Sequence, residues 1–208
     1  MSPILDHPLA FPKLVSLTLS IMSPDCGTGQ TVQFPVLDSL TISGDWGIFP
    51  QINAPKLTRL ALQQELYSKK SRIASKLRRA TARPTSLSIT DDLPELHLID
   101  LLSRTWPTLR DLHWESSKGI VFPGPAATVA LAGDEEREPL CPELRYFTVH
   151  MDMAFGKVVD HIKQTVDRLG VVVRRRESIY PGRLQRVYCS WTYAVDLGSA
   201  REEWIDVL

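Results

Sequence analysis

The chain has 208 residues, of which 43% are hydrophobic and 23% are charged, as in an ordinary soluble globular protein. Its 24 Lys and Arg balance its 24 Asp and Glu, so the overall charge excludes a general attraction to nucleic acid or to an anionic membrane. No apolar run approaches the roughly 18 residues of a membrane helix, and the first residues lack the features of a secretory signal. We therefore expect no membrane span and a cytoplasmic or nuclear protein.

One nine-residue pattern recurs along the chain: an apolar residue, Pro, any residue, Leu, any two residues, Leu, any residue and an apolar residue. Regular copies begin at Phe11, Phe34, Ala54, Trp106 and Cys141, and two less regular copies lie at 84–89 and 183–189. The second apolar anchor of each copy serves as its marker, and the markers are Leu17, Leu40, Leu60, Leu87, Leu112, Phe147 and Val187. Successive markers are 23, 20, 27, 25, 35 and 40 residues apart. The first four spacings lie within or near the ~20–29 residues of a leucine-rich repeat.

Each copy predicts a short strand, because its apolar and polar residues alternate. In residues 39–43, Leu40 and Ile42 point to one side, and the hydroxyl residues between and beside them point to the other. Similar units joined by about 20 residues are too far apart for hairpins, so the strands should stack in parallel. The expected fold is α/β: a single leucine-rich-repeat solenoid over residues 1–208, with about seven irregular repeats. Its curved parallel sheet should carry helices and turns on the convex side.

The segments between the copies predict turns and helices. Short turns are expected at 20–33 and 43–53, because Gly, Pro, Ser and Asp are frequent there. Helical spacing of apolar residues predicts helices at 65–80, at 93–104 and at 154–169, the last one ending at Gly170. Residues 171–173 should then form a strand or an extended connector.

Two segments in the C-terminal half, an insertion and the tail, also have predicted structures. Residues 116–140 form an insertion, expected to be a partly mobile loop with a short helix near 126–132. The segment 194–208 should cap the last repeat, with Trp204, Ile205 and Leu208 on one side.

These repeats resemble the leucine-rich-repeat portion of fungal F-box-like proteins, whose strands follow an aromatic residue or Cys and then Pro. The nearest match is residues 98–112, which read Leu-Ile-Asp-Leu-Leu-Ser-Arg-Thr-Trp-Pro-Thr-Leu-Arg-Asp-Leu. The resemblance covers about residues 8–193 and implies a part in substrate recognition. The family's adaptor-binding F-box should precede the repeats, which here begin almost at Met1, so assembly into a ubiquitin ligase is not carried over.

The family's repeats commonly carry Asn three residues beyond the last leucine of the strand. The equivalent positions here are almost all polar but none is Asn: Met22, Asp45, Glu65, Asp92, Ser117, Asp152 and Thr192. A carboxylate at such a position accepts hydrogen bonds but donates none, so we expect an irregular curve here.

The outward residues of the strands should form three rows on the concave side of the solenoid. The rows are Ser16, Ser39, Arg59, Ser86, Asp111, Tyr146, Arg186; Thr18, Thr41, Ala61, Ser88, His113, Thr148, Tyr188; and Ser20, Ser43, Gln63, Thr90, Glu115, His150, Ser190. Aromatic and charged residues of the kind that anchor interfaces gather in the C-terminal half. The expected partner-binding residues are Arg59, Asp111, His113, Glu115, Tyr146, His150, Arg186 and Tyr188. A solvated face without a partner remains the alternative.

The sequence thus favours a monomeric protein–protein interaction module for a partner it does not identify. The alternative is a basic-patch binder of nucleic acid or anionic membrane, because no acid interrupts a basic run comprising Lys69, Lys70, Arg72, Lys76, Arg78 and Arg79. That run is also compatible with a solvated helix face, as is the shorter run Arg174–Arg176.

An enzyme is the third and least favoured reading. A metal site from His113, Glu115, His150 and Asp152 lacks dense ligand spacing. A catalytic set from Ser88, His113 and Asp111 lacks a strained nucleophile turn and an oxyanion donor. We therefore expect no catalytic residue, no metal and no cofactor. Three cysteines without a Cys-x-x-Cys spacing are expected to be buried thiols in a reducing compartment.

Overall fold

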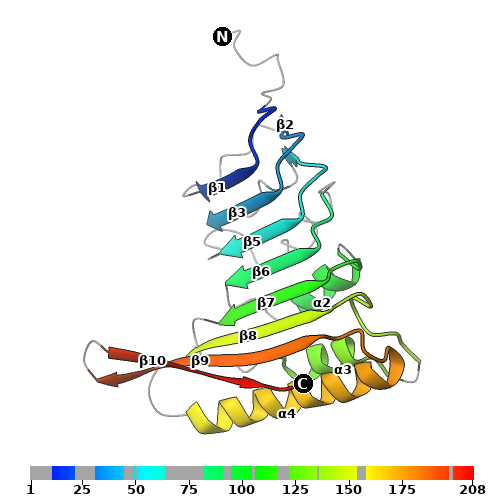
Figure 1. Ribbon diagram of the computed structural model, residues 1–208, viewed down its shortest axis with the longest axis vertical. Coiled ribbons are helices and arrows are strands. Elements are labelled where there is room, and N and C mark those ends of the chain that lie inside the picture. The colour runs from blue at the N-terminus through cyan, green and yellow to red at the C-terminus, as the bar shows by residue number, and fades with distance from the viewer. Residues whose placement is uncertain are drawn as a thin grey trace.

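A large, mostly parallel sheet dominates the protein (Figure 1). The computed structural model describes residues 11–21, 31–44, 49, 51–63, 82–90, 95–104, 106–116, 122–134, 136–153, 158–196 and 199–208. Eight strands pair in the order β1 (Ser16–Ile21), β3 (Ser39–Gly44), β5 (Arg59–Gln63), β6 (Ser86–Thr90), β7 (Asp111–Ser116), β8 (Tyr146–Met153), β9 (Arg186–Asp196) and β10 (Ser199–Asp206). All pairs up to β9 are parallel, and β10 is antiparallel to β9. The predicted mixed α/β fold with stacked parallel strands is confirmed.

The proline of each regular copy lies in a tight turn that leads into the strand. In all five regular copies the leucine two residues after Pro donates its backbone N–H to the carbonyl before Pro, as from Leu37 to Phe34 at 3.3 Å and from Leu144 to Cys141 at 2.9 Å. Pro suits the second position of such a turn because its ring fixes φ near −65° and no N–H is needed there. The repeated motif is therefore a turn followed by a strand.

The seven markers lie in one ladder across the sheet, as expected. The pairing joins Leu17, Leu40, Leu60, Leu87, Leu112, Phe147 and Val187 in consecutive register. From Leu40 onward the markers are at most 2% exposed. They form one side of the core, and each such side chain contributes roughly 1.5–3 kcal/mol when it leaves water.

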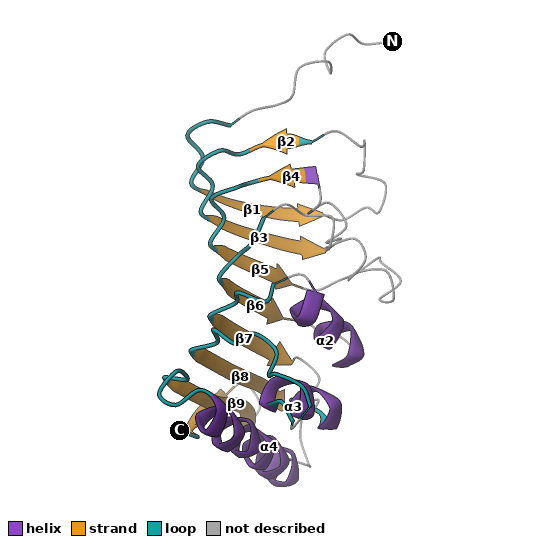
Figure 2. Ribbon diagram, turned by 90° about the vertical axis from the view of Figure 1, so that its right-hand side faces the viewer, coloured by secondary structure: helices purple, strands orange, loops and turns teal. Residues whose placement is uncertain are grey.

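The helices that the structure describes all lie on one face of the sheet, and no described helix lies on the other face (Figure 2). They are α2 (Glu95–Arg104), α3 (Pro125–Ala132) and α4 (Val158–Ile179). In α2 the residues expected to point inward, Leu98, Leu101 and Leu102, are buried. The start of α3 is held by α2, since the Glu95 carboxylate accepts the N–H of Ala127.

Two expectations about α4 are wrong. The helix continues through Gly170 to Ile179, so Gly170 does not end it and residues 171–173 are helical. A glycine costs a helix interior roughly 1 kcal/mol, which the buried Leu169 and Val172 on either side of it offset. The run Arg174–Arg176 is not wholly solvated either, because Arg176 is only 2% exposed.

Short strands and the C-terminal hairpin were not anticipated. Strands β2 (Val32–Gln33) and β4 (Ile52–Asn53) form a second parallel sheet, which Asn53 Nδ2 reinforces by donating to Gln33 Oε1 at 2.6 Å. At the other end, β10 pairs along the edge of β9. Because side chains alternate along a strand, Trp204 and Ile205 lie on opposite faces of the sheet and not on one side as expected. The helix predicted at 65–80 lies outside the described residues.

Replacing Gly44 with Ala is expected to lower the free energy of unfolding by about 1–3 kcal/mol. Gly44 has φ +94°, and a Cβ there would lie 2.0 Å from the carbonyl oxygen of Ile21. The matched control is Gly182→Ala, since Gly182 has φ +68° but nothing within 4 Å of the added carbon. Urea unfolding of both variants gives the two losses in the free energy of unfolding. Their difference separates the clash with the Ile21 carbonyl from the backbone strain that both variants share. Equal losses would contradict the close approach of β3 to β1.

Candidate functional site

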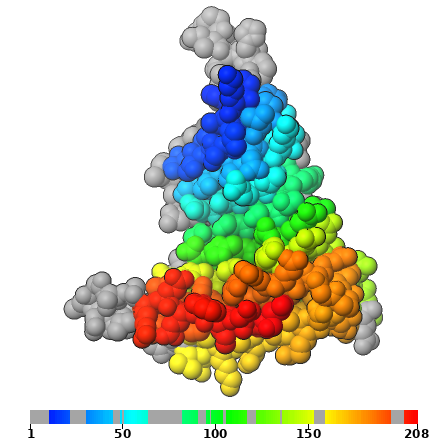
Figure 3. All heavy atoms as spheres, viewed as in Figure 1, coloured from blue at the N-terminus to red at the C-terminus, as the bar shows by residue number. Residues whose placement is uncertain are grey.

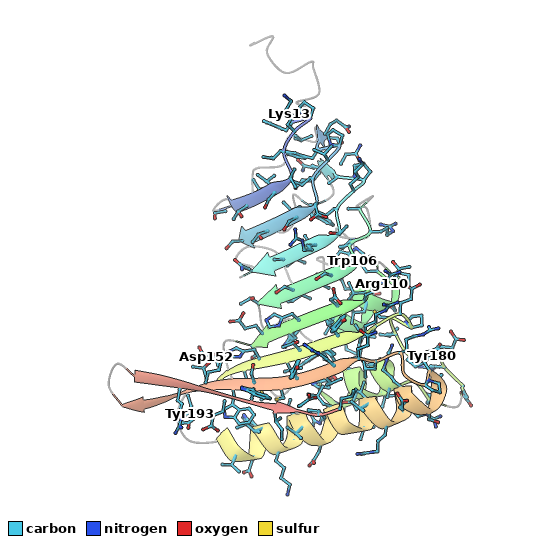
Figure 4. The ribbon with its side chains drawn as sticks, in the orientation of Figure 1. Lys13, Trp106, Arg110, Asp152, Tyr180 and Tyr193 are labelled. Atoms are coloured by element: carbon cyan, nitrogen blue, oxygen red, sulfur yellow. The ribbon has the colours of Figure 1, made fainter. Side chains whose placement is uncertain are left out.

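The open face, defined here as the helix-free side of the sheet, carries the three polar rows expected from the alternation. Every predicted row is joined in register from β1 to β9. Figure 3 shows this face as a surface that narrows toward the N-terminal end. In Figure 4, Arg110 lies where the strands begin and Asp152 lies where they end. The strands of the open face therefore run from the Arg110 side to the Asp152 side.

The structure brings most of the predicted binding residues together on β7, β8 and β9. Neighbouring strands place Asp111, Tyr146 and Arg186 in the first row. The second row holds His113 and Tyr188, and the third holds Glu115 and His150. Arg59 lies apart on β5, where it forms an ion pair with Asp38 at 2.7 Å. The cluster on β7–β9 is therefore the candidate site, and Arg59 does not belong to it.

Histidine and hydroxyl groups form a bonded network in the third row. His150 Nδ1 lies 2.8 Å from the Ser190 hydroxyl, and His150 Nε2 lies 3.3 Å from the Thr192 hydroxyl. On the next strands Thr90 donates to a Glu115 carboxylate oxygen at 2.9 Å. These bonds hold the side chains in fixed positions, which lowers the entropy that a partner must remove on binding. Sequence reasoning did not select Ser190 or Thr192 as site residues.

Burial shifts the ionisation of two residues in this cluster. Burial lowers the pKa of His113, and nearby His150 adds to this, whereas the Glu115 carboxylate opposes it. Burial raises the pKa of Asp111, against the opposing charges of Arg110 and Arg145. Both shifts disfavour the charged form, as expected for side chains that are partly removed from water.

Lowering the pH is expected to destabilise the protein through His113. The folded pKa lies below the ordinary value of 6.5, so the unfolded chain takes up the proton first and stability is lost as the pH falls below about 6.5. Between about pH 7.5 and pH 5.5, the melting temperature of the His113→Gln variant should fall less than that of the wild type.

The same shift has a test that does not depend on unfolding. Glu115→Gln removes the carboxylate that raises the pKa of His113. The pKa of His113, followed by its imidazole NMR signals, should therefore fall further in this variant. A rise would contradict the placement of Glu115 beside His113.

Aromatic residues extend the site onto β10. Trp204 packs edge-on against Tyr188 at 6.3 Å between ring centroids and is 68% exposed. The pairing of β10 with β9 sets Trp204 beside Ser190 and Asp206 beside Tyr188. On the strand-start side, the Tyr146 hydroxyl donates to Gln185 Oε1 at 2.6 Å. Sequence reasoning missed Trp204 because it treated the tail as a cap, although its alternation with Ile205 and Asp206 was a weak signal.

The residues considered for a catalytic or a metal site lie on the neighbouring strands β6, β7 and β8. Within the described part of the chain, no hydrogen bond joins Ser88, His113 and Asp111, although β6 and β7 set the first two side by side. The described residues also contain no group of three or more His, Cys, Asp or Glu that could hold a metal ion. Asp152, expected beyond the strand, lies within β8 beside Thr192.

The thiols that the structure describes are buried. Cys141 and Cys189 lie in the core, and burial raises the pKa of each thiol to about 12. A thiol that resists ionisation is a poor nucleophile, so these two act as small apolar core residues. No helix among the described residues has the length and apolar character needed to cross a bilayer.

The basic patch of the sequence lies outside the described residues. This holds for all of its members: Lys69, Lys70, Arg72, Lys76, Arg78 and Arg79.

Searches of protein-family models, of curated proteins and of solved structures found no match to this chain.

Proposed function

We propose that the chain is a leucine-rich-repeat solenoid that works as a protein–protein interaction module. By resemblance, it would recognise the substrate of an F-box-like protein. The observation that carries the proposal is the open face of β7–β10. There Tyr146, Tyr188, Trp204 and Arg186 gather on adjacent strands. Tyr, Trp and Arg are the residues that most often dominate binding energy at protein interfaces.

The solenoid part of the proposal rests on regularity along the stack. Before each of the inner strands, one carbonyl accepts two N–H groups from the next repeat. Thus Arg145 and Tyr146 both donate to the Arg110 carbonyl, at 2.8 and 3.0 Å, and Gln185 and Arg186 both donate to that of Arg145, at 2.8 and 3.1 Å. Equal contacts between successive units are what a repeat protein uses to propagate one structure.

The mixed charge of the site favours a protein partner over nucleic acid. Asp111 and Glu115 contribute negative charge on β7, and Arg186 contributes positive charge on β9. A phosphate backbone repeats one negative charge along its length and would meet these carboxylates. A folded protein surface can match both signs, and its apolar residues can cover the exposed tyrosine and tryptophan.

Site-specific photocrosslinking tests this function. A benzophenone amino acid at Tyr188 should capture a specific protein in extracts of the cells that make this protein. The same group at Asp167, which is exposed on α4, should not capture it. Capture of the same proteins at both positions, or of none at Tyr188, would contradict a recognition surface on the open face.

A further inference from the structure

The two edges of the sheet are built differently. The β10 edge contains four charged residues, Arg201, Glu202, Glu203 and Asp206. Strand β1, at the opposite edge, reads Ser-Leu-Thr-Leu-Ser-Ile and contains no charge, Pro or Gly. Charges and prolines are how proteins prevent an edge strand from pairing with another chain. Strand β1 has none of these defences, and among the described residues nothing pairs with its outer edge.

Among the described residues, the core also ends at β1. Leu17 and Leu19 are half-buried, whereas Leu40 and Ile42, their partners one strand further in, are fully buried. Beside them lies an apolar groove of about 270 Å³, lined mainly by Phe11, Leu14, Leu17, Leu19, Val32 and Phe34. Phe11 is 45% exposed and stacks on Phe34 at 5.3 Å. This end of the core would gain stability from one more apolar strand.

The sequence of β1 is suited to pairing with itself. Residues 16–20 read Ser-Leu-Thr-Leu-Ser in both directions. An antiparallel pair centred on Thr18 therefore sets like residues opposite one another: Leu17 opposite the partner subunit's Leu19, and Ser16 opposite the partner subunit's Ser20. Facing leucines lie on the groove side, and facing hydroxyl residues lie on the open face. Such cross-strand pairs stabilise a sheet, and no like charges meet.

We propose that β1 pairs antiparallel with β1 of a second copy of this chain, forming a two-fold symmetric dimer. A self-complementary patch is what an isologous dimer interface requires. The two sheets then join into one, and the two open faces lie on the same side with their candidate sites at the far ends. One strand pair and one groove from each copy make a small interface, so we expect a dissociation constant on the order of micromolar.

Sedimentation velocity of the full chain from about 1 to 200 µM tests the proposal. The wild type should shift from monomer to dimer. Thr18→Lys and Thr18→Glu should each raise the dissociation constant at least tenfold, because like charges then meet at the centre of the strand pair. An equimolar mixture of these two variants should form a dimer again. The control, Ser88→Lys, introduces the same side chain in the same row on β6 and should dimerise as the wild type does.

Three results would overturn the dimer. They are a wild type that stays monomeric throughout this range, a dimer that Thr18→Lys leaves unchanged, and variants that fail to pair when mixed. Circular dichroism melting of each variant shows that it is folded. If the lysine variant is unfolded, Thr18→Cys provides a second readout. Strand pairing about Thr18 brings the two thiols within disulfide range, and the oxidised dimer should form at this position and not with Ser88→Cys.

Discussion

Replacing Phe147 with alanine is expected to lower the free energy of unfolding by about 3–5 kcal/mol. Phe147 is fully buried and lies in the marker ladder between Leu112 and Val187. Its ring meets Phe122 edge-on at 6.2 Å. Removal of the ring leaves a cavity between two strands that backbone hydrogen bonds hold in place, so the walls cannot close over it.

The neighbouring residue supplies the control for this prediction. Tyr146→Ala removes an aromatic ring from the same strand, but this ring lies on the open face and is 42% exposed. We expect that change to cost about 1 kcal/mol or less. Denaturant unfolding of both variants measures the difference. Similar losses would mean that Phe147 does not face a common core.

Replacing Arg176 with methionine is expected to lower the free energy of unfolding by about 2–5 kcal/mol. The Arg176 guanidinium donates to three backbone carbonyls, those of Leu131 at 2.9 Å, Leu140 at 2.8 Å and Cys141 at 2.7 Å. The Leu131 carbonyl belongs to the last turn of α3. A carbonyl in that turn has no hydrogen-bond donor within its own helix. Arg176 thus ties the end of α3 and the turn before β8 to α4.

Methionine preserves the apolar stem but supplies no donor, so the carbonyls lose their partners while they stay buried. The control is Arg174→Met, at an exposed position of the same helix, for which we expect a change within about 0.5 kcal/mol. Thermal or urea unfolding gives the comparison. An Arg176→Met protein as stable as Arg174→Met would show that the three carbonyls have other partners.

The strand ladder was predictable from sequence because two signals agreed. Alternation around Leu40 and Ile42 predicted a strand, and the recurrence of the same motif predicted that its copies lie in register. The three rows of the open face followed from that register without further information. The turn at each Pro was also encoded locally, since Pro favours the second position of a tight turn.

The features that were not predictable depend on contacts between distant residues. Glycine is common at helix ends, but here the burial of Leu169 and Val172 outweighs the cost of placing Gly170 inside a helix. In the sequence, Arg176 belongs to a basic run that is typical of a solvent-exposed surface. The carbonyls that it binds come from distant residues and meet it only in the folded chain. Trp204 joined the candidate site because the tail returns as a strand beside β9, a pairing that no local pattern announces.

The affinity for the protein captured at Tyr188 tests recognition by the open face most directly. Isothermal titration should give a dissociation constant at least about 100-fold higher for the triple variant His113→Ala/Tyr146→Ala/Tyr188→Ala than for the wild type. The triple variant Asp160→Ala/Gln164→Ala/Asp167→Ala, which changes exposed residues of α4, should bind within about twofold of the wild type. Equal affinities for the wild type and the open-face variant would contradict recognition by the open face.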